Sequence, residues 1–407
     1  MLAGNALFFL DGYEKAIKVS SKGYPNMGVS EASREKVLRG SKEGFSDVVK
    51  TNSALVRKRI RDTRLKVKQK TLGERSQTVV QILYMEDLVR PGLVEDIERK
   101  LDSFVIDGVL DSGVLEQMTE KSWLSPFPQF QTTERPDKCS AEILNGRVVV
   151  LTDHSPMSLI LPAVFNDFLQ VSEDYYNRFE IVSLQRLIRY AAVLFTLLFS
   201  AAYLAVTNFH TQVLPTNLIL SFSQARQGVP FPGILEVLLM ELAFETIREA
   251  GVRMPGPLGG TIGIVGGLIV GQAAVEANLV SPIVVVVVAV TALCSLAIPN
   301  EEFTAPFRLL KFAFILLGGT LGMFGMILGL YLTASHLAGL KSFGIPYLSP
   351  FGAQIKEGFR GEEDGMVRFP LRFLKTRPVY AKKEQQVRLK ETETGGQAGK
   401  EGKSYVR

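Results

Sequence analysis

Two polar side chains stand one helical turn apart in a stretch that carries no other charge. Gln272 and Glu276 are four residues apart, and Glu276 is the only charged side chain in residues 254–300. At the centre of a membrane helix an acidic residue costs about 2.5 to 3.5 kcal/mol, so such a side chain should face water, a protein partner or a bound cation. This pair therefore suggests an ion pathway.

A second interpretation of the same residues stays open. Asn278 and Pro282 indicate a loop directly after Glu276, and a carboxylate at a helix end can simply reach headgroup water. The valine run at residues 284–288 could form a hydrophobic constriction or could only face lipid. The candidates for a pore or ion pathway are Gln272, Glu276, Asn278, Val284 and Val288.

Glycines recur at a spacing that lets helices approach closely. Four of them follow one another at every fourth residue of this apolar stretch, and two pairs with the same spacing occur in the last long apolar segment. Glycine leaves a groove without side chains into which a second membrane helix can pack; general tolerance of glycine in such helices is the alternative. The helix-packing candidates are Gly259, Gly263, Gly267, Gly271, Gly318, Gly322, Gly325 and Gly329.

The segment at residues 231–250 combines an apolar stripe with an acidic one, in which glutamates are spaced by four. Such an amphipathic helix either lies in the membrane interface or spans the membrane with its acids against protein or water. Its coupling or interface candidates are Glu241, Glu245, Glu249 and Arg248.

A basic run comes earlier in the chain. Residues 50–70 contain nine Lys or Arg and one acid, Asp62, and we expect a helix over residues 43–70. A solvated helix face, a face on anionic lipid or an acidic partner subunit, and nucleic-acid binding are the three explanations. We expect no nucleic-acid partner, because interleaved aromatic residues and a recognition motif are lacking. The interface candidates are Arg57, Arg59 and Arg61.

Catalytic and cofactor chemistry find no support. Asp153, His154 and Ser155 are consecutive, whereas a fold assembles the members of a catalytic triad, and a turn after a strand favours Asp and Ser for local backbone bonds. The chain also lacks a phosphate-binding glycine loop and a His/Cys cluster for zinc. The sequence therefore predicts a protein that is not an enzyme and has no cofactor and no metal.

The two halves of the chain cannot share one solvent. Of its 407 residues, 46% are hydrophobic and 21% charged, and long apolar segments occur only from Tyr190 onward. Residues 190–206, 258–280, 283–298 and 307–337 approach the ~20 residues that span a membrane. The last segment has 31 residues, or about 46 Å of helix, so it must tilt, break or extend beyond the lipid.

The direction of these segments follows from charge. Arg186 and Arg189 precede the first segment and place the N-terminal half in the cytoplasm. Counting the amphipathic segment gives five crossings, and leaving it out gives four. We favour four, because the residues after Lys341 are rich in Lys and Arg and are expected in the cytoplasm.

The cytoplasmic half is expected to be α/β. Strand-turn-strand patterns at residues 7–17 and 147–161 coincide at an offset of 142 residues, which suggests two copies of one subdomain. Residues 79–84 should form a buried strand and residues 91–101 a helix. The first copy is incomplete, so we expect that part of it is missing.

Four regions follow. Residues 1–70 are the remnant of the first α/β subdomain with a basic linker helix, and residues 71–185 are the second subdomain. Residues 186–340 are an all-α, multi-pass membrane domain of four or five helices. Residues 341–407 are a short basic tail in the cytoplasm with a disordered end.

Five separated motifs resemble one protein family. They are EGFSDVVKTNSALVRKRIRDTRLKV (43–67), SPFPQFQTTERPD (125–137), GVPFPGILEVLLMELAFETIREAGVRMP (228–255), GQAAVEANLVSP (271–282) and SFGIPYLSP (342–350). In this order they are similar to the A subunit of spore nutrient germinant receptors, the GerA family. The likeness covers nearly the whole chain, but family members usually carry a further N-terminal stretch.

The resemblance implies a multi-pass protein of the spore inner membrane that acts with a transporter-like B subunit, which binds the nutrient, and a lipoprotein C subunit. It also implies self-association into a ring that conducts monovalent cations and starts germination. Two alternatives are kept: an accessory membrane protein of the spore dipicolinate-release machinery, and a membrane-anchored signalling scaffold.

Overall fold

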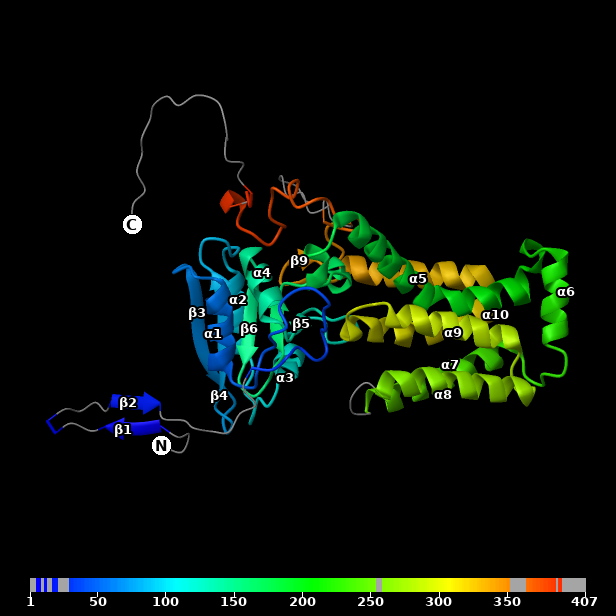
Figure 1. The fold of residues 1–407 in the computed structure, drawn as a ribbon, viewed down its shortest axis with the longest axis horizontal. Helices are drawn as coiled ribbons and strands as arrows, with labels where there is room; N and C mark the ends of the chain where they lie inside the picture. Colours follow the sequence, from blue (N-terminus) through cyan, green and yellow to red (C-terminus); the bar gives the residue numbers. More distant parts are fainter. Residues whose placement is uncertain are drawn as a thin grey trace, which may run out of the picture.

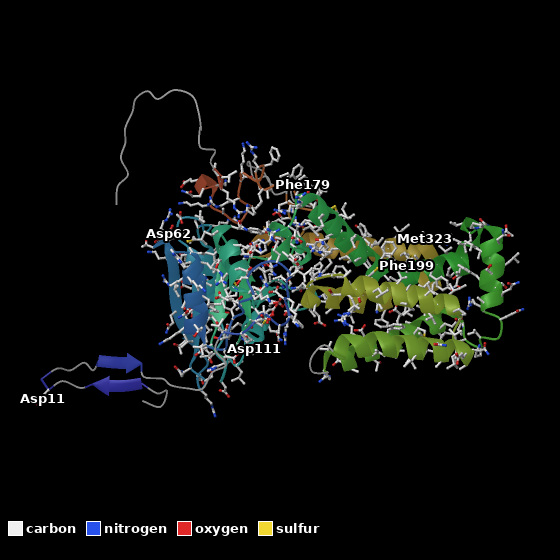
Figure 2. The ribbon with its side chains drawn as sticks, viewed as in Figure 1. Asp11, Asp62, Asp111, Phe179, Phe199 and Met323 are labelled. Carbon is white, nitrogen blue, oxygen red and sulfur yellow. The ribbon has the colours of Figure 1, made fainter. Side chains whose placement is uncertain are left out.

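The computed structural model describes residues 5–8, 11–12, 17–20, 29–253, 258–351, 364–385 and 387–389. An α/β half and a helical half lie end to end (Figure 1). Asp62 and Asp111 lie on the α/β half, whereas Phe199 and Met323 lie on the helical half (Figure 2). The division inferred from composition is therefore a division of the fold.

One antiparallel sheet of five strands, in the order β3-β4-β6-β7-β5, organises the α/β half. The strands are β3 (Leu65–Leu72), β4 (Thr78–Met85), β5 (Gln131–Thr133), β6 (Val148–Thr152) and β7 (Ser158–Leu161). β6 is buried along its whole length and β4 along most of it, because helices cover both faces of the sheet.

Two pairs of helices provide this cover: α1 (Val49–Arg59) and α4 (Pro136–Leu144) on one face, and α2 (Leu93–Leu101) and α3 (Ser112–Thr119) on the other. Successive residues of β6 point to opposite faces. Val149 and Leu151 pack with the first pair, and Val148 and Val150 pack with the second. The α/β class expected for this half is confirmed.

Both strand-turn-strand patterns form hairpins. β1 (Asn5–Phe8) pairs with β2 (Ile17–Ser20), and β6 pairs with β7. The strand expected at residues 79–84 and the helix expected at 91–101 correspond to β4 and α2. That the two hairpins come from two copies of one subdomain stays a prediction.

The helix expected over residues 43–70 is wrong, because α1 occupies only its middle and β3 takes its last part. The end of this run alternates with a period of two, as a strand requires. Lys68 and Lys70 lie on the same face of β3, where they form ion pairs with Glu98 (3.0 Å) and Asp102 (2.5 Å) of the α2 region. Pairing with β4 and with these acids outweighs the helix propensity of a basic run.

The helical half contains α5 (Phe179–Phe209), the short α6 (Thr216–Ala225), α7 (Gly233–Val252), α8 (Leu258–Glu276), α9 (Pro282–Leu296) and α10 (Glu301–Gly339). The four apolar segments of the sequence fall in α5, α8, α9 and α10, and the amphipathic segment is α7. Within the described part of the chain, α5 and α10 are long and apolar enough to cross a membrane, and α9 is a shorter apolar helix.

α10 breaks at Gly322, which has φ 63° and ψ −144°. A Cβ at Gly325 would collide with the carbonyl oxygen of Leu317, and one at Gly329 would lie 3.0 Å from the ring of Phe314. Residues after Gly322 therefore contact residues before it, Gly325 against Leu317 and Gly329 against Phe314. α10 is thus a hairpin of two antiparallel arms. The long apolar segment breaks rather than tilts, and its arms measure about 31 and 25 Å.

An aromatic cluster joins the two halves. Phe168 stacks on Phe303 at a centroid distance of 5.0 Å, and Phe127 meets Phe307 edge to face at 5.4 Å. Tyr347, which follows the second arm of α10, lies 6.3 Å from Phe168. Both ends of the α10 hairpin are thus held against the α/β half.

The segment after α10 returns to the α/β half as well. Ser342 donates a hydrogen bond to the carbonyl oxygen of Gln129 (2.8 Å), and the ring of Tyr380 lies 3.8 Å from the guanidinium of Arg147. The described part of the expected tail is therefore packed against folded protein. Residues 390–407, where a disordered end was expected, lie outside the described residues.

The arginines before the first apolar segment serve this junction too. Arg186 is fully buried and forms ion pairs with Asp174 (3.1 Å) and Asp364 (2.8 Å), and Arg189 binds the same Asp174 (2.8 Å). These pairs fix the start of α5 to the α/β half and to the returning tail.

Candidate functional site

α7 carries a fully buried acid in the middle of the helical half. The carboxylate of Glu241 accepts a hydrogen bond from Ser200 of α5 (2.6 Å) and forms an ion pair with Lys311 of α10 (2.6 Å). Ser200 is in turn 3.0 Å from Thr291 of α9. Four helices therefore meet at one charged pair.

The acidic stripe continues towards the α/β half. Glu245 binds Arg308 and lies 3.7 Å from Lys311, while Arg248 reaches Glu301 at 3.5 Å. Successive partners are one turn apart on α7 and one or two turns apart on α10, so the stripes of the two helices face each other. Glu249 instead pairs with Arg253 (2.6 Å) at an exposed position.

A second buried acid lies towards the far end of α7. Glu236 is fully buried, binds Arg226 (3.0 Å) and accepts a hydrogen bond from the backbone N–H of Ser281, the residue before α9 (3.0 Å). We call the set of paired side chains along α7 the ion-pair row. It consists of Arg226, Glu236, Glu241, Glu245, Arg248, Glu301, Arg308 and Lys311.

Five of the eight residues in this row were not predicted from the sequence: Arg226, Glu236, Glu301, Arg308 and Lys311. Arg308 and Lys311 are three residues apart at the start of an otherwise apolar segment, and this spacing was the available signal. Two cations in such a segment need buried partners, because removing an ion from water costs several kcal/mol. The acids on α7 supply them.

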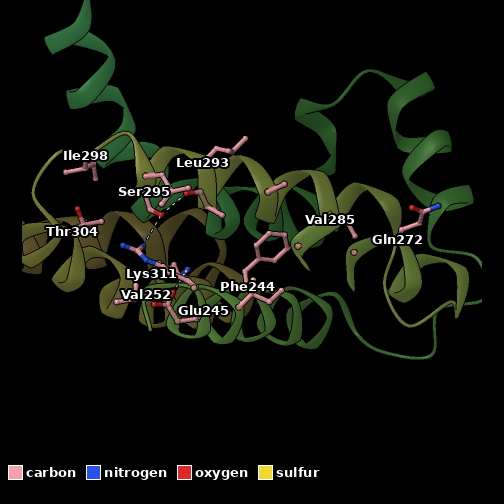
Figure 3. Close-up of a pocket in the computed structure, with 18 of the residues that line it drawn as sticks. Phe244, Glu245, Val252, Gln272, Val285, Leu293, Ser295, Ile298, Thr304 and Lys311 are labelled. Atoms are coloured by element: carbon pink, nitrogen blue, oxygen red, sulfur yellow. Dashed lines mark hydrogen bonds and ion pairs between the residues drawn. The ribbon is translucent and has the colours of Figure 1, made fainter. Parts of the chain in front are cut away.

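A cavity of about 980 Å³ lies beside the ion-pair row, between α7, α8, α9 and the start of α10. Figure 3 shows Phe244 in its middle, Ser295, Thr304 and Lys311 at one end, and Gln272 towards the other. The cavity is thus apolar in the middle and polar at both ends.

The predicted polar pair lines the far end of this cavity. The amide of Gln272 donates to the carboxylate of Glu276 at 3.3 Å, and both side chains are exposed. Asn278 is exposed, has φ 54° and lies directly after α8, as suits a residue that tolerates the left-handed region. The loop inferred after Glu276 is present, and both interpretations of Glu276 fit this position.

The structure places the two valines elsewhere. Val284 and Val288 are fully buried and pack with Leu204 of α5, Val237 of α7 and Ile315 of α10. They can therefore line an ion path only if that path runs through the interior of this chain. A pore role for them stays a prediction.

The glycines of α8 lie against neighbouring helices. A Cβ at Gly267 would lie 3.0 Å from the ring of Phe244 on α7, and one at Gly271 would lie 3.0 Å from Val285 on α9. The surroundings of two further candidates on α8, Gly259 and Gly263, lie outside the described residues.

The glycines of α10 pack within the chain as well. A Cβ at Gly318 would lie 2.7 Å from the carbonyl oxygen of Ala201 on α5. Gly322, Gly325 and Gly329 shape the hairpin. A role for any of these glycines in contacts between subunits stays a prediction.

The basic candidates lie on or just after α1, far from the cavity. Arg59 and Lys58 both bind Glu43 (2.7 Å each), Arg61 donates to the carbonyl oxygen of Lys58 (3.3 Å), and Arg57 is exposed. An interface role for Arg57, Arg59 and Arg61 stays a prediction. Among the residues that the structure describes, no group of three or more His, Cys, Asp or Glu could hold a metal ion.

One carboxyl of the α/β half faces the start of α10. Burial, and the neighbouring carboxylates of Glu302 and Glu120, raise the pKa of Glu116 on α3 to about 8. The junction between the halves therefore holds a carboxyl that stays protonated near neutral pH.

The chain thus consists of an α/β domain joined to a helical bundle that carries paired charges inside it. Residues 1–380 match the family described as Bacillus/Clostridium GerA spore germination protein. The chain therefore belongs to the GerA family, and the resemblance seen in its five motifs is confirmed.

Several known proteins are similar to this chain. Spore germination protein GerLA of Bacillus cereus is 39% identical over 392 residues, which are 96% of this chain and 79% of that protein. The uncharacterized membrane protein YfkQ of Bacillus subtilis (strain 168) is 40% identical over 349 residues, 86% of this chain and 68% of that protein. The crystallised N-terminal domain of the A subunit of the Bacillus megaterium spore germinant receptor GerK3 is 30% identical, and the match covers 30% of this chain and 97% of that chain, with a TM-score of 0.25.

Proposed function

We propose that this chain is the A subunit of a spore nutrient germinant receptor and that its helical half is the ion-conducting part. Copies of the chain form a ring in the inner membrane of the spore. Monovalent cations leave through it when a nutrient binds a transporter-like B subunit, and a lipoprotein C subunit completes the receptor. Family membership and relatives named as spore germination proteins support this role.

The arrangement of the helices supports a multi-pass membrane domain. α5, α7, α8, α9 and the two arms of α10 alternate in direction. The tail after α10 lies beside the α/β half, so the number of crossings is even. We therefore propose six crossings rather than four, with the α/β half and the tail in the cytoplasm.

The observation that carries the conducting role is the buried pair of Lys311 and Glu241 beside the cavity. Ionised groups inside a membrane domain are expensive and rare, and those that occur can mark ion pathways or proton relays. Glu276, an exposed carboxylate at the end of α8, is the acid that a cation meets on its way.

The test compares two exposed glutamates in spores that make the receptor. At equal membrane abundance, we expect Glu276→Ala to lower nutrient-triggered release of monovalent cations roughly tenfold, since one lost carboxylate contact of about 1.4 kcal/mol has this effect. Glu249→Ala, which changes an exposed glutamate that pairs with Arg253, should stay within about twofold of the unaltered chain. Unchanged release from assembled Glu276→Ala receptors contradicts the pathway.

A further inference from the structure

The cavity beside the ion-pair row also opens sideways. Its middle is lined by apolar side chains, among them Phe244 on α7 and Ala289 on α9. Three apolar residues at its margin, Val252, Leu293 and Leu296, are 63%, 62% and 62% exposed. In a membrane this rim would face hydrocarbon rather than water, so a molecule that enters here comes from the lipid.

α8 and α9 leave room for such a molecule. They touch where Gly271 of α8 meets Val285 of α9, near the loop that connects them. From there the cavity runs between the helices towards Leu296, at the end of α9 that faces the α/β half. A mostly apolar space that extends along three helices suits a hydrocarbon chain better than a compact polar ligand.

The end of the cavity near the α/β half offers a phosphate partner. Arg248 lines it, and its guanidinium makes two long hydrogen bonds, to Ser295 (3.4 Å) and to Glu301 (3.5 Å). Charge-assisted hydrogen bonds are normally 2.7 to 2.9 Å, and a guanidinium has five donors. Arg248 thus has donors left for a phosphate oxygen.

We propose that this cavity binds one acyl chain of a membrane phospholipid, with the phosphate of that lipid at Arg248. The inference rests on the membrane placement proposed above. The chain lies along Phe244, Ala289 and Leu293 and separates α8 from α9. The lipid thereby sets the distance between α8, which carries Glu276, and α9.

Two tryptophan substitutions on α9 test the acyl-chain site. Ala289→Trp fills the cavity, whereas Val286→Trp adds the same side chain at a position that is 62% exposed and does not line it. Binding of dioleoylphosphatidylglycerol to the full chain, stripped of lipid in detergent, is measured by native mass spectrometry. We expect one tightly held lipid per chain, a loss of roughly tenfold or more in affinity for Ala289→Trp, and a change below about twofold for Val286→Trp.

The headgroup is tested by further arms of the same measurement. Arg248→Gln should weaken binding of the phospholipid but leave binding of dioleoylglycerol, which has no phosphate, unchanged. Inorganic phosphate alone should not bind. Binding of inorganic phosphate as tight as that of the phospholipid, or equal lipid binding by the two tryptophan variants, overturns the proposal.

Two other outcomes are also decisive. If the stripped chain dimerises through this face and lipid does not compete, the occupant is a second copy, and the proposal is overturned. Alkaline carbonate extraction separates this failure from that of the membrane placement. If the chain resists extraction but binds no lipid in this cavity, only the acyl-chain site is overturned. If carbonate releases the chain from the membrane, the acyl-chain site and the membrane placement are both overturned.

Discussion

Each half of the molecule contains a Lys–Glu ion pair, but the pair in the α/β half is partly exposed and the pair in the helical half is buried. In the α/β half Lys68 meets Glu98 at 3.0 Å with side chains 41% and 23% exposed, and in the helical half Lys311 meets Glu241 at 2.6 Å with side chains 6% and 0% exposed. Water screens the first pair, so breaking it costs little. Nothing replaces a lost partner in the second pair, so breaking it leaves a bare buried charge.

The largest expected effect comes from breaking the buried pair. Lys311→Met should lower the free energy of unfolding by about 3 to 5 kcal/mol, because Glu241 is left without its cation. Thermal unfolding of the full chain in detergent measures this loss. The double variant Lys311→Met/Glu241→Leu should recover most of it, and a double variant as unstable as the single one contradicts the explanation.

The break in α10 comes next. Gly322→Ala should cost about 2 to 3 kcal/mol, because its backbone conformation is one that side chains rarely adopt, and because a Cβ would lie 3.1 Å from the ring of Phe209. Gly339→Ala is the matched control, since its Cβ would meet nothing within 4 Å. Equal unfolding temperatures for the two variants would show that the hairpin does not depend on Gly322.

The α/β half should show a pH-dependent effect at Glu116. Its pKa of about 8 in the folded chain lies above the ordinary 4.5, so the folded state holds a proton that the unfolded state has lost. The contribution of this protonated carboxyl to the free energy of unfolding is therefore fully present below pH 4.5 and is lost as the pH rises through 8. At pH 9 Glu116→Gln should be more stable than the unaltered chain by roughly 1 to 2 kcal/mol, and near pH 4 it should be equal.

Denaturant unfolding at pH 4, 7 and 9 measures this difference. Glu95→Gln, on the exposed side of α2, is the control for removing a surface charge and should change the free energy of unfolding by less than about 0.5 kcal/mol. A difference between Glu116→Gln and the unaltered chain that is the same at all three pH values speaks against a protonated carboxyl at the junction.

The smallest effect is expected at the exposed pair. Lys68→Met should change the free energy of unfolding by less than about 1 kcal/mol, and 1 M salt should remove even this difference. Salt should leave the effect of Lys311→Met almost unchanged, because a buried pair is screened much less. Similar losses and similar salt dependence for both variants would remove the distinction between the halves.

Local patterns in the sequence predicted much of this fold. The apolar segments of α5, α8, α9 and α10 and the hairpin of β6 and β7 follow from periodicity and turn residues. The run at residues 43–70 misled, since a basic stretch suits a helix and an edge strand alike until its partners are known. Glu98 and Asp102, which decide it, lie about thirty residues further on.

The candidate site was predicted only in part, because here too the partners lie far apart in the sequence. Glu241 was named as a coupling or interface candidate, but its partner Lys311 is 70 residues away, and no local period connects the two. The cavity could not be predicted at all, because it arises where α8 and α9 diverge. Gln272 and Glu276 were found because a charge inside an apolar stretch is visible in the sequence itself.

The most direct test of the central claim is cation flux across lipid vesicles that contain this chain and its partner subunits. We expect a nutrient-dependent flux of monovalent cations that is lost when this chain is omitted, falls with Glu276→Ala and persists with Glu249→Ala. A flux of the same size and selectivity from the partner subunits alone would contradict this claim.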